Sequence, residues 1–535
     1  MRVPSATYRL QFNGDFTFSH ASALVPYLAE LGVGDLYASP YLKARPGSTH
    51  GYDVVDPASL NPELGGEQDY WQMVQVLRDH GMGQLLDIVP NHMGVGTDNA
   101  LWYDVLENGP TSPYASYFDI DWFPAGKQEL QGKVLLPILG DHYRAALERG
   151  EVKLAFDTEA GAFTAKYYEH RFPLDPRTYP MVFGSISLPD ASEHRSEIGR
   201  LVIAFGNLPG RDVMDEDSVV ARARDAASLK SYLADLCARR SEVARAVEER
   251  VRWLNGEGFE ELHQLFEAQA YRLAHWRVAG DQINYRRFFA VNDLAGVRVE
   301  DEEVFAATHG LVLRLLEQGA VDGLRVDHPD GLRDPTAYFE RLHDAVLGAA
   351  GGPVYTLVEK ILAHEESLPD DWPVSGTTGY DFTNLVNGLF VDPEGEAGID
   401  EAYQGFVGGS IEFPKLLLGC KHKVMRDALA SELNALSYRL LAIAEQGRSY
   451  DFSFETLRRA LSEVVAHFPV YRTYIGPGRI SGADREHLDA AVQGARRRVM
   501  ATRASSISSA TSFCGLPGTP EPSISPTGSS STRGP

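Results

Sequence analysis

A strand-like segment that ends in charged side chains constrains the fold of this chain most. Residues 321–329 read Val-Asp-Gly-Leu-Arg-Val-Asp-His-Pro, so an apolar stretch finishes in the pair Arg325 and Asp327. This pattern predicts a buried β-strand with polar side chains at its carboxyl end. In barrels of parallel strands, that end of each strand is where catalytic residues lie.

A second strand of this kind ends at Glu359, after a helical pattern at residues 336–349. Strand, helix and strand in succession form a parallel pair, so Asp327 and Glu359 are expected at the same edge of a sheet. Two neighbouring carboxylates suit glycoside hydrolysis with retention, in which one attacks the sugar and the other protonates the leaving oxygen. The alternative is two charges in surface loops, with a salt bridge between Asp327 and Arg325.

Polar side chains follow two earlier predicted strands as well. The loop after the strand at residues 34–39 contains His50, Tyr52 and Asp53. The strand at residues 83–89 contains Asp87 near its carboxyl end and is followed by Asn91 and His92. A Tyr ring can pack on the face of a pyranose while the polar groups bond its hydroxyls. A solvent-facing loop and a structural histidine are the alternatives.

The alternation of strands and helices predicts an α/β fold, a (β/α)8 barrel that is incomplete at its C-terminal end and carries large, mainly helical inserted subdomains. The alternation stops near residue 94 and resumes near residue 320, a gap too long for a loop. The boundaries expected are 1–93 for the first part of the barrel, 94–319 for the insertion, 320–400 for the barrel continuation, 401–500 for a helical insertion and 501–535 for a tail.

Composition narrows the class of partner. A formal net charge of −24 disfavours nucleic acid and anionic membrane surfaces as partners, because both reward clustered Lys and Arg. Three scattered cysteines suggest neither a disulfide framework nor a zinc site. We find no apolar signal segment and no apolar run of 18 residues, so a cytoplasmic location is expected.

Three segments resemble the signature regions of the alpha-amylase family of glycoside hydrolases and transferases: residues 87–92, 323–327 and 358–359. Within that family, the chain is similar to the maltooligosyltrehalose synthases, which are (1→4)-alpha-D-glucan 1-alpha-D-glucosylmutases. The stretches that carry this narrower resemblance are residues 6–13, 36–40, 50–54, 61–66, 284–289, 328–335, 359–362, 376–382 and 468–474. Together they span the chain to about residue 498.

The resemblance implies a retaining mechanism. Asp327 would be the nucleophile, Glu359 the general acid and then base, and Arg325 would keep Asp327 ionised. Tyr52 would stack on the reacting glucose and His92 would bond a hydroxyl. The other residues expected to bind substrate are His50, Asp53, His328, Arg286 and Arg287, with Asp87 and Asn91 orienting the site. For the pair Arg286 and Arg287, a subdomain interface is an equal alternative.

The resemblance also implies a reaction and a substrate, a maltooligosaccharide or linear alpha-1,4-glucan. The freed reducing-end glucose would turn in the pocket and attack through its anomeric hydroxyl, giving an alpha,alpha-1,1 bond. Water must be excluded for this, and the insertion at residues 94–319 is the candidate wall. No cofactor and no obligatory metal are expected, because nothing besides Asn91 suggests an oxygen cage. A trehalose-releasing hydrolase of the same pathway would be a functional partner.

Two departures from the family pattern stand out. Gly331 occupies a position at which many amylases have Lys or His. No His-Asp pair of the family's third-carboxylate type follows Glu359, and the resemblance stops before the Ser-, Pro- and Thr-rich residues 501–535, which are expected to be disordered. We therefore expect a truncated chain with impaired activity, a natural short form being the alternative. An alpha-1,4-glucan hydrolase and a noncatalytic maltooligosaccharide-binding protein are the competing functions.

Overall fold

A six-stranded parallel sheet forms the centre of the computed structural model, which describes residues 1–184, 186, 194–363, 366–448, 450–476 and 478–513. Its strands are, in spatial order, β1 (Thr7–Leu10), β2 (Asp35–Ala38), β5 (Gly83–Ile88), β14 (Gly323–Val326), β15 (Tyr355–Val358) and β16 (Gly376–Thr377). Spatial order equals chain order, as in successive units of a (β/α)8 barrel. In the described part of the chain β1 and β16 stand at the two ends of the sheet.

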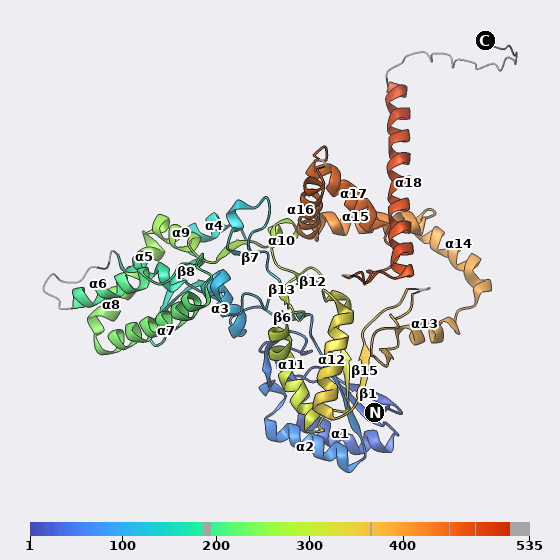
Figure 1. The fold of residues 1–535 in the computed structure, drawn as a ribbon, viewed down its shortest axis with the longest axis horizontal. Coiled ribbons are helices and arrows are strands. Elements are labelled where there is room, and N and C mark those ends of the chain that lie inside the picture. The colour runs from blue at the N-terminus through green and yellow to red at the C-terminus, as the bar shows by residue number, and fades with distance from the viewer. Residues whose placement is uncertain (185, 187–193, 364–365, 449, 477, 514–535) are drawn as a thin grey trace, which may run out of the picture.

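Helices cover the outer face of this sheet (Figure 1). They are α1 (Phe18–Glu30), α2 (Glu67–Asp79), α11 (Glu302–Glu317) and α12 (Pro335–Ala350). In α1 the buried residues Phe18, Ala21, Val25 and Leu28 recur at helical spacing, which gives the helix one apolar face. Every residue of β5 is buried, as expected for a central strand of a parallel sheet with both faces covered.

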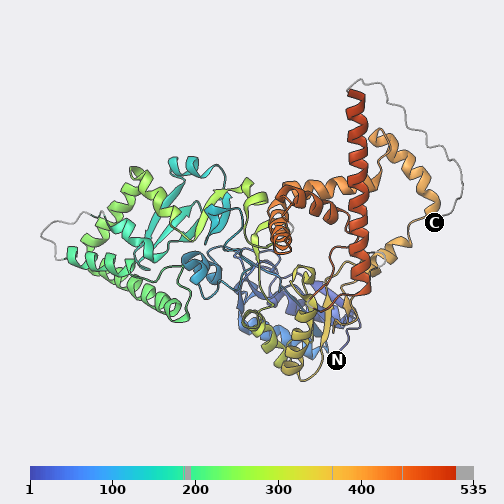
Figure 2. The same cartoon turned by 45° about the horizontal axis from the view of Figure 1, so that its top comes forward.

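A long excursion separates β5 from β14 and forms a second lobe, at the left in Figures 1 and 2. Its strands are β7 (Val134–Leu139), β8 (Val152–Asp157), β9 (Ala162–Tyr167), β10 (His170–Pro173) and β11 (Tyr271–His275). Its helices are α3 (Ala100–Asn108), α4 (Tyr143–Glu148), α5 (Tyr179–Phe183), α6 (His194–Gly206), α7 (Glu216–Arg239), α8 (Ser241–Gly256) and α9 (Phe259–Glu267). The short helix α10 (Ala279–Gln282) lies between this lobe and the C-terminal helices, in contact with α16 (Figure 1).

Two small sheets line the rim between the barrel strands and this lobe. One pairs β3 (Leu42–Ala44) with β4 (Val54–Leu60). The other has the order β12 (Arg287–Phe288), β13 (Val291–Gly296) and β6 (His92–Gly94). Because β6 directly follows β5 in the chain, the second sheet brings residues of the 283–300 segment back to the barrel rim.

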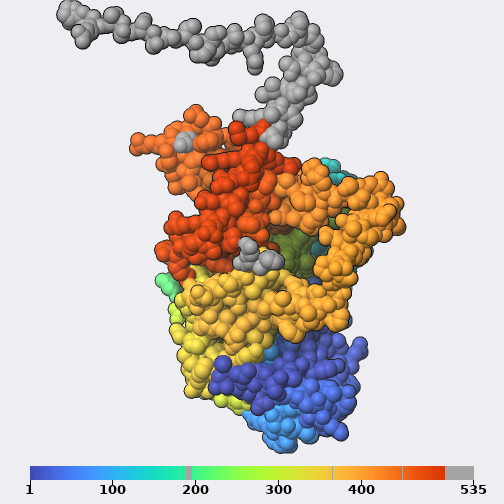
Figure 3. Space-filling model, turned by 90° about the vertical axis from the view of Figure 1, so that its right-hand side faces the viewer, coloured from blue at the N-terminus to red at the C-terminus, as the bar shows by residue number. Residues whose placement is uncertain are grey.

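The C-terminal part is helical and lies above the barrel (Figure 3). Its helices are α13 (Tyr380–Gly388), α14 (Glu396–Val407), α15 (Phe413–Asp427), α16 (Ala430–Gln446), α17 (Phe454–Ala466) and α18 (Gly482–Phe513). The boundary expected at residue 501 falls inside α18, because Ser, Ala and Thr continue a helix that is already formed. The rest of the expected tail, residues 514–535, lies outside the described residues. No helix in the described part of the chain is both long and apolar enough to cross a membrane.

Candidate active site

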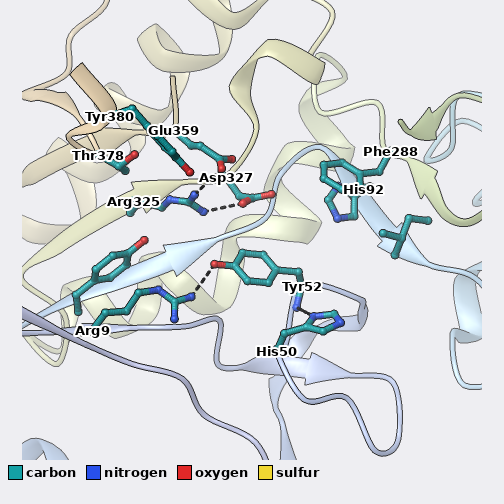
Figure 4. Close-up of a pocket in the computed structure, with 12 residues that line it drawn as sticks. Arg9, His50, Tyr52, His92, Phe288, Arg325, Asp327, Glu359, Thr378 and Tyr380 are labelled. Atoms are coloured by element: carbon teal, nitrogen blue, oxygen red, sulfur yellow. Dashed lines mark hydrogen bonds and ion pairs between the residues drawn. The ribbon is translucent and has the colours of Figure 1, made fainter. Parts of the chain in front are cut away.

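A pocket of ≈ 640 Å³ opens at the carboxyl ends of the sheet strands (Figure 4). Its lining residues come from β1, β2, β14 and the residue after it, the loop between β3 and β4, the sheet of β12, β13 and β6, the loops after β15 and β16, and the start of α13. They are Arg9, Tyr37, His50, Tyr52, His92, Phe288, Leu294, Arg325, Asp327, Glu359, Thr378 and Tyr380. Tyr, Phe and His rings alternate with charged groups around it. Such a mixture fits a ligand with apolar faces and many hydroxyls.

The guanidinium of Arg325 holds three carboxylates together at the base of the pocket. Its Nη1 donates to Oδ1 of Asp87 at 2.7 Å and to Oδ1 of Asp327 at 2.6 Å. Its Nη2 lies 3.1 Å from Oε1 of Glu359. The strand register explains this grouping, because Arg325 of β14 stands opposite Asp87 of β5 and Leu357 of β15. The two carboxylates expected to be catalytic are thus bridged by one buried cation.

The carboxylate of Asp87 accepts hydrogen bonds from two tyrosines of the pocket, Tyr52 and Tyr37. The Tyr52 hydroxyl donates to Oδ2 of Asp87 at 2.6 Å and accepts a hydrogen bond from Nη2 of Arg9 at 2.9 Å. The Tyr37 hydroxyl donates weakly to the same carboxylate oxygen at 3.4 Å. Burial and the nearby Asp87 raise the pKa of Tyr52, so the phenol stays neutral. The hydrogen bonds of its hydroxyl with Asp87 and Arg9 fix the position of the ring in the pocket.

Asp327 is buried close to other carboxylates, and this controls its protonation. Burial raises its pKa, Arg325 lowers it, and the charges of Asp87 and Glu359 raise it again, for a net rise to about 7. Arg325 itself loses proton affinity through burial but gains more from Asp87 and Asp327, so its pKa is raised. The arginine therefore stays charged, whereas Asp327 is half ionised at about pH 7 and becomes mostly protonated as the pH falls below that value.

Glu359 is held from the backbone as well. The amide N–H of His328 donates to Oε2 of Glu359 at 2.9 Å. His328 adopts a left-handed backbone conformation, with φ of 43°, which is strained for a residue with a side chain. This turn follows Asp327 directly, so the conformation of one residue orients both the nucleophile candidate and the acid candidate.

Gly331 closes this turn and explains one departure from the amylase pattern. A Cβ atom at this position would collide with the side chains of Asn91 and His328. Asn91 cannot easily move away, because its Oδ1 accepts a 2.5 Å hydrogen bond from Nη1 of Arg286. The Lys or His found here in many amylases therefore has no room in this loop.

His92 presents an unsatisfied ring nitrogen to the pocket. The Asn91 amide Nδ2 can only donate, so Nδ1 of His92 accepts at 3.2 Å and Nε2 carries the proton. Within the described part of the chain Nε2 is buried without a partner, as is Oγ1 of Thr378 on the opposite side. Burial, with the nearby His328 and Arg286, lowers the pKa of His92 to about 3. Buried polar groups are normally hydrogen-bonded, so a ligand hydroxyl is a suitable partner for each of these two groups.

Six of the predicted site residues do not line the pocket: Asp53, Asp87, Asn91, Arg286, Arg287 and His328. Asp53 accepts from Oγ of Ser48 at 2.5 Å and braces the loop that carries His50 and Tyr52. Arg286 clamps Asn91 and pairs with Asp119, Nε to Oδ2 being 3.0 Å. Arg287 pairs with Glu432 of α16 at 2.7 Å. Both guanidiniums bond protein partners, which favours the interface alternative for this pair; a substrate contact stays a prediction.

Six residues that line the pocket were not among the predicted site residues: Arg9, Tyr37, Phe288, Leu294, Thr378 and Tyr380. Arg9 and Tyr37 stand side by side on β1 and β2, in register. A charged or hydroxyl-bearing residue one position before the end of a predicted strand is the signal that could have found Arg9 and Tyr37, because it marks a side chain that faces the barrel axis near the rim.

Comparison with known proteins shows what the chain as a whole is similar to. The family model for the alpha-amylase catalytic domain matches residues 21–149. A putative maltooligosyl trehalose synthase of Mycobacterium tuberculosis (strain H37Rv) is 34% identical over 447 residues, which are 82% of this chain and 45% of the relative. An intracellular maltogenic amylase of Bacillus subtilis is 38% identical over 98 residues, 18% of this chain and 16% of the amylase.

Solved structures show the same relationship. The maltooligosyltrehalose synthase from Arthrobacter ramosus superposes with a TM-score of 0.66 at 34% identity, covering 94% of this chain and 52% of that chain. These matches confirm the expected (β/α)8-type fold with helical insertions. The chain spans about half the length of the relatives it matches.

Proposed function

We propose, from the premise that the chain is a relative of the maltooligosyltrehalose synthases of the alpha-amylase family, that it rearranges the reducing end of maltooligosaccharides. The terminal alpha-1,4 bond would become an alpha,alpha-1,1 bond, without net uptake of water. The observation that carries this proposal is the bridge made by Arg325 between Asp327 and Glu359 at two neighbouring strand tips. Retaining transfer between sugars uses two neighbouring carboxyl groups, one as the nucleophile and the other as the acid and then the base.

In the first step Asp327 attacks the anomeric carbon of the penultimate glucose. Arg325 holds Oδ1 of Asp327, so Oδ2 is the attacking oxygen. The protonated carboxyl of Glu359 gives its proton to O4 of the terminal glucose as the C1–O4 bond breaks. The products are a glycosyl ester on Asp327 and a free terminal glucose that is still in the pocket.

In the second step the terminal glucose turns, and its anomeric hydroxyl attacks the anomeric carbon that is bound to Asp327. Glu359, now a carboxylate, accepts the proton of that hydroxyl, and Asp327 leaves as a carboxylate. Each residue returns to its starting protonation state. Inversion occurs twice at the attacked carbon, so its alpha configuration is kept.

The pocket supports binding of sugar rings in three ways. The Tyr52 ring offers a flat apolar face whose hydroxyl is already bonded to Asp87. His92 Nε2 and Thr378 Oγ1 supply unsatisfied polar groups at two sides. Phe288, which packs on His92 with ring centroids 4.5 Å apart, closes the third side. The uncharged substrate agrees with the net charge of −24.

The same proposal includes a pathway partner and a location. The nonreducing product would pass to a hydrolase that releases trehalose from its end. A cytoplasmic location is supported by Cys237 and Cys420, which are free cysteines in the described part of the chain.

The test is incubation of the purified chain with maltopentaose, scoring nonreducing product against free glucose. Glu359→Gln should abolish product formation, whereas Glu340→Gln, the same change on the exposed face of α12, should leave it unaltered. Free glucose as the main product would replace the proposal by an alpha-1,4-glucan hydrolase. Binding of maltopentaose without any turnover would replace it by a carbohydrate-binding role.

A further inference from the structure

Lys360 directly follows Glu359, and its ammonium group is almost fully buried. The side chain is 1% exposed, and Nζ lies 3.0 Å from Oδ2 of Asp330 and 2.8 Å from Oε1 of Glu366. A buried cation between two carboxylates is costly to desolvate and is retained only where the geometry is well satisfied. Lys360 lies outside the pocket lining, so a contact with substrate does not account for it.

Asp330 is the point where three separate segments meet. Its Oδ1 accepts a 2.5 Å hydrogen bond from the Tyr474 hydroxyl, and its main-chain oxygen accepts one from Nη1 of Arg472 at 2.9 Å. The Lys360 ammonium also lies over the Tyr474 ring, 5.6 Å from its centroid. The segment at residues 472–474 is thereby fastened to the turn that follows the nucleophile candidate, although more than a hundred residues separate them.

That turn carries the strained residue of the site. Asp330 is the middle residue of the 3₁₀ turn Pro329–Gly331, and His328, with φ of 43°, caps it. The His328 amide is the group that donates to Glu359. These contacts form a closed ring of four residues. Glu359 precedes Lys360 in the chain, and the Lys360 ammonium pairs with Asp330. Asp330 lies in the turn that His328 caps, and the His328 amide donates back to Glu359.

We propose that Lys360 is a positioning residue for the sugar-transfer reaction. By anchoring Asp330 it holds His328 in the left-handed conformation, and so keeps the carboxyl of Glu359 aimed at the leaving oxygen. Left-handed backbone at a non-glycine residue persists only where its surroundings fix it, and Lys360 with Tyr474 supplies that constraint. The role in catalysis rests on the proposed function; the mechanical role of Lys360 in the turn does not.

The test compares Lys360→Met and Tyr474→Phe with Lys415→Met, in which an exposed lysine of α15 is changed in the same way. Amide hydrogen exchange is followed by mass spectrometry for the peptide spanning residues 328–334. Lys360→Met should accelerate exchange there at least tenfold, and Tyr474→Phe to a smaller degree, whereas Lys415→Met should leave it unchanged. Because Tyr474→Phe removes one hydroxyl only, it keeps the test decisive if Lys360→Met fails to fold.

Kinetics with maltopentaose supply the second arm. The kcat of Lys360→Met should fall at least tenfold while its KM stays within threefold of the unaltered chain, because the pocket lining is untouched. Exchange equal to that of Lys415→Met, or a KM that rises in step with the loss of kcat, overturns the proposal. If the unaltered chain turns over no glucan, the proposed function fails, and the exchange result alone decides the role of Lys360.

Discussion

Nη1 of Arg325 donates to Oδ1 of Asp327 at 2.6 Å, although the two residues are separated by a single valine. Alternate residues of a strand face the same side, so the pair points together into the barrel. The same guanidinium also contacts Asp87 and Glu359. One buried cation therefore contacts all three carboxylates at the base of the pocket.

Arg325→Lys should cost most of the activity. An ammonium is a single point of charge and cannot contact three carboxylates in the fixed geometry of a planar guanidinium. We expect kcat/KM with maltopentaose to fall at least about a hundredfold, and the folded state to lose about 3 kcal/mol because buried carboxylates lose their partner. Initial rates and chemical unfolding check both. Arg245→Lys on the exposed face of α8 is the control, and an equal loss in that variant would contradict the explanation.

Asp327→Asn should inactivate the chain but stabilise it at neutral and alkaline pH. The pKa of Asp327 is raised from 3.8 to about 7, so between these values the folded state holds a proton that the unfolded state has lost. Stability therefore falls as the pH rises through this window, and the penalty is complete above about pH 7. The Asn variant lacks the penalty. Thermal unfolding from pH 4 to 8 should show that the Tm of Asp327→Asn exceeds that of the unaltered chain by a margin that grows with pH. A margin that stays constant would contradict the raised pKa of Asp327.

The same raised pKa predicts the acid limb of the activity. Only the ionised carboxyl of Asp327 can attack the anomeric carbon, so kcat/KM should rise with pH up to about pH 7. The measurement is a pH profile of nonreducing product formation from maltopentaose. A rate that is already flat from pH 5 upward would show that Arg325 keeps Asp327 ionised more effectively than burial opposes it.

His92 should make the fold sensitive to acid. Its pKa is lowered from 6.5 to about 3 by burial, so below pH 6.5 the unfolded chain gains a proton that the folded chain does not accept. This contribution to stability is lost progressively as the pH falls from 6.5 to 3. His92→Asn should reduce the loss of Tm between pH 7 and pH 5. His170→Gln, which removes an exposed histidine of β10, should not, and an identical acid loss in all three chains would refute the assignment.

Tyr52 should act through its ring more than through its hydroxyl. Tyr52→Phe removes one donor from Asp87 and should destabilise the fold by about 1–3 kcal/mol while maltopentaose binding weakens only a few-fold. Tyr52→Ala also removes the stacking surface and should weaken binding at least tenfold. Isothermal titration of the two variants, made inactive by Glu359→Gln, separates the two effects. Equal losses in Phe and Ala would assign the role to the hydroxyl instead.

Much of the fold could be predicted because its signals are local. Apolar runs of four to six residues that end in a charge mark the parallel strands, and the helices between them show a regular apolar spacing. The residues at the strand tips could be predicted for the same reason. Residue type and position along a single strand are enough to place Asp327 and Glu359 at one edge of the sheet.

What could not be predicted depends on partners that are distant in the chain. Arg286 and Arg287 have the composition of substrate-binding residues, but Asp119 and Glu432 occupy their guanidiniums. Those partners lie 167 and 145 residues away, respectively. Similarly, no residue pattern near Lys360 predicts its contact with Tyr474. Whether a polar side chain faces a ligand or a protein partner is decided by tertiary packing, which residue patterns do not encode.

The hydrogen bond between Arg325 and Asp87 joins residues that are 238 positions apart, and the whole second lobe lies between them. During synthesis β5 emerges long before β14. The sheet of the first three strands, β1, β2 and β5, therefore cannot add its next strand until the whole second lobe has been synthesised. Contacts of such long sequence separation are entropically expensive to close and slow to form. Folding of the intervening lobe before β14 pairs with β5 would shorten the effective loop. The lobe would then influence how fast the catalytic strands assemble, separately from any part it plays in binding.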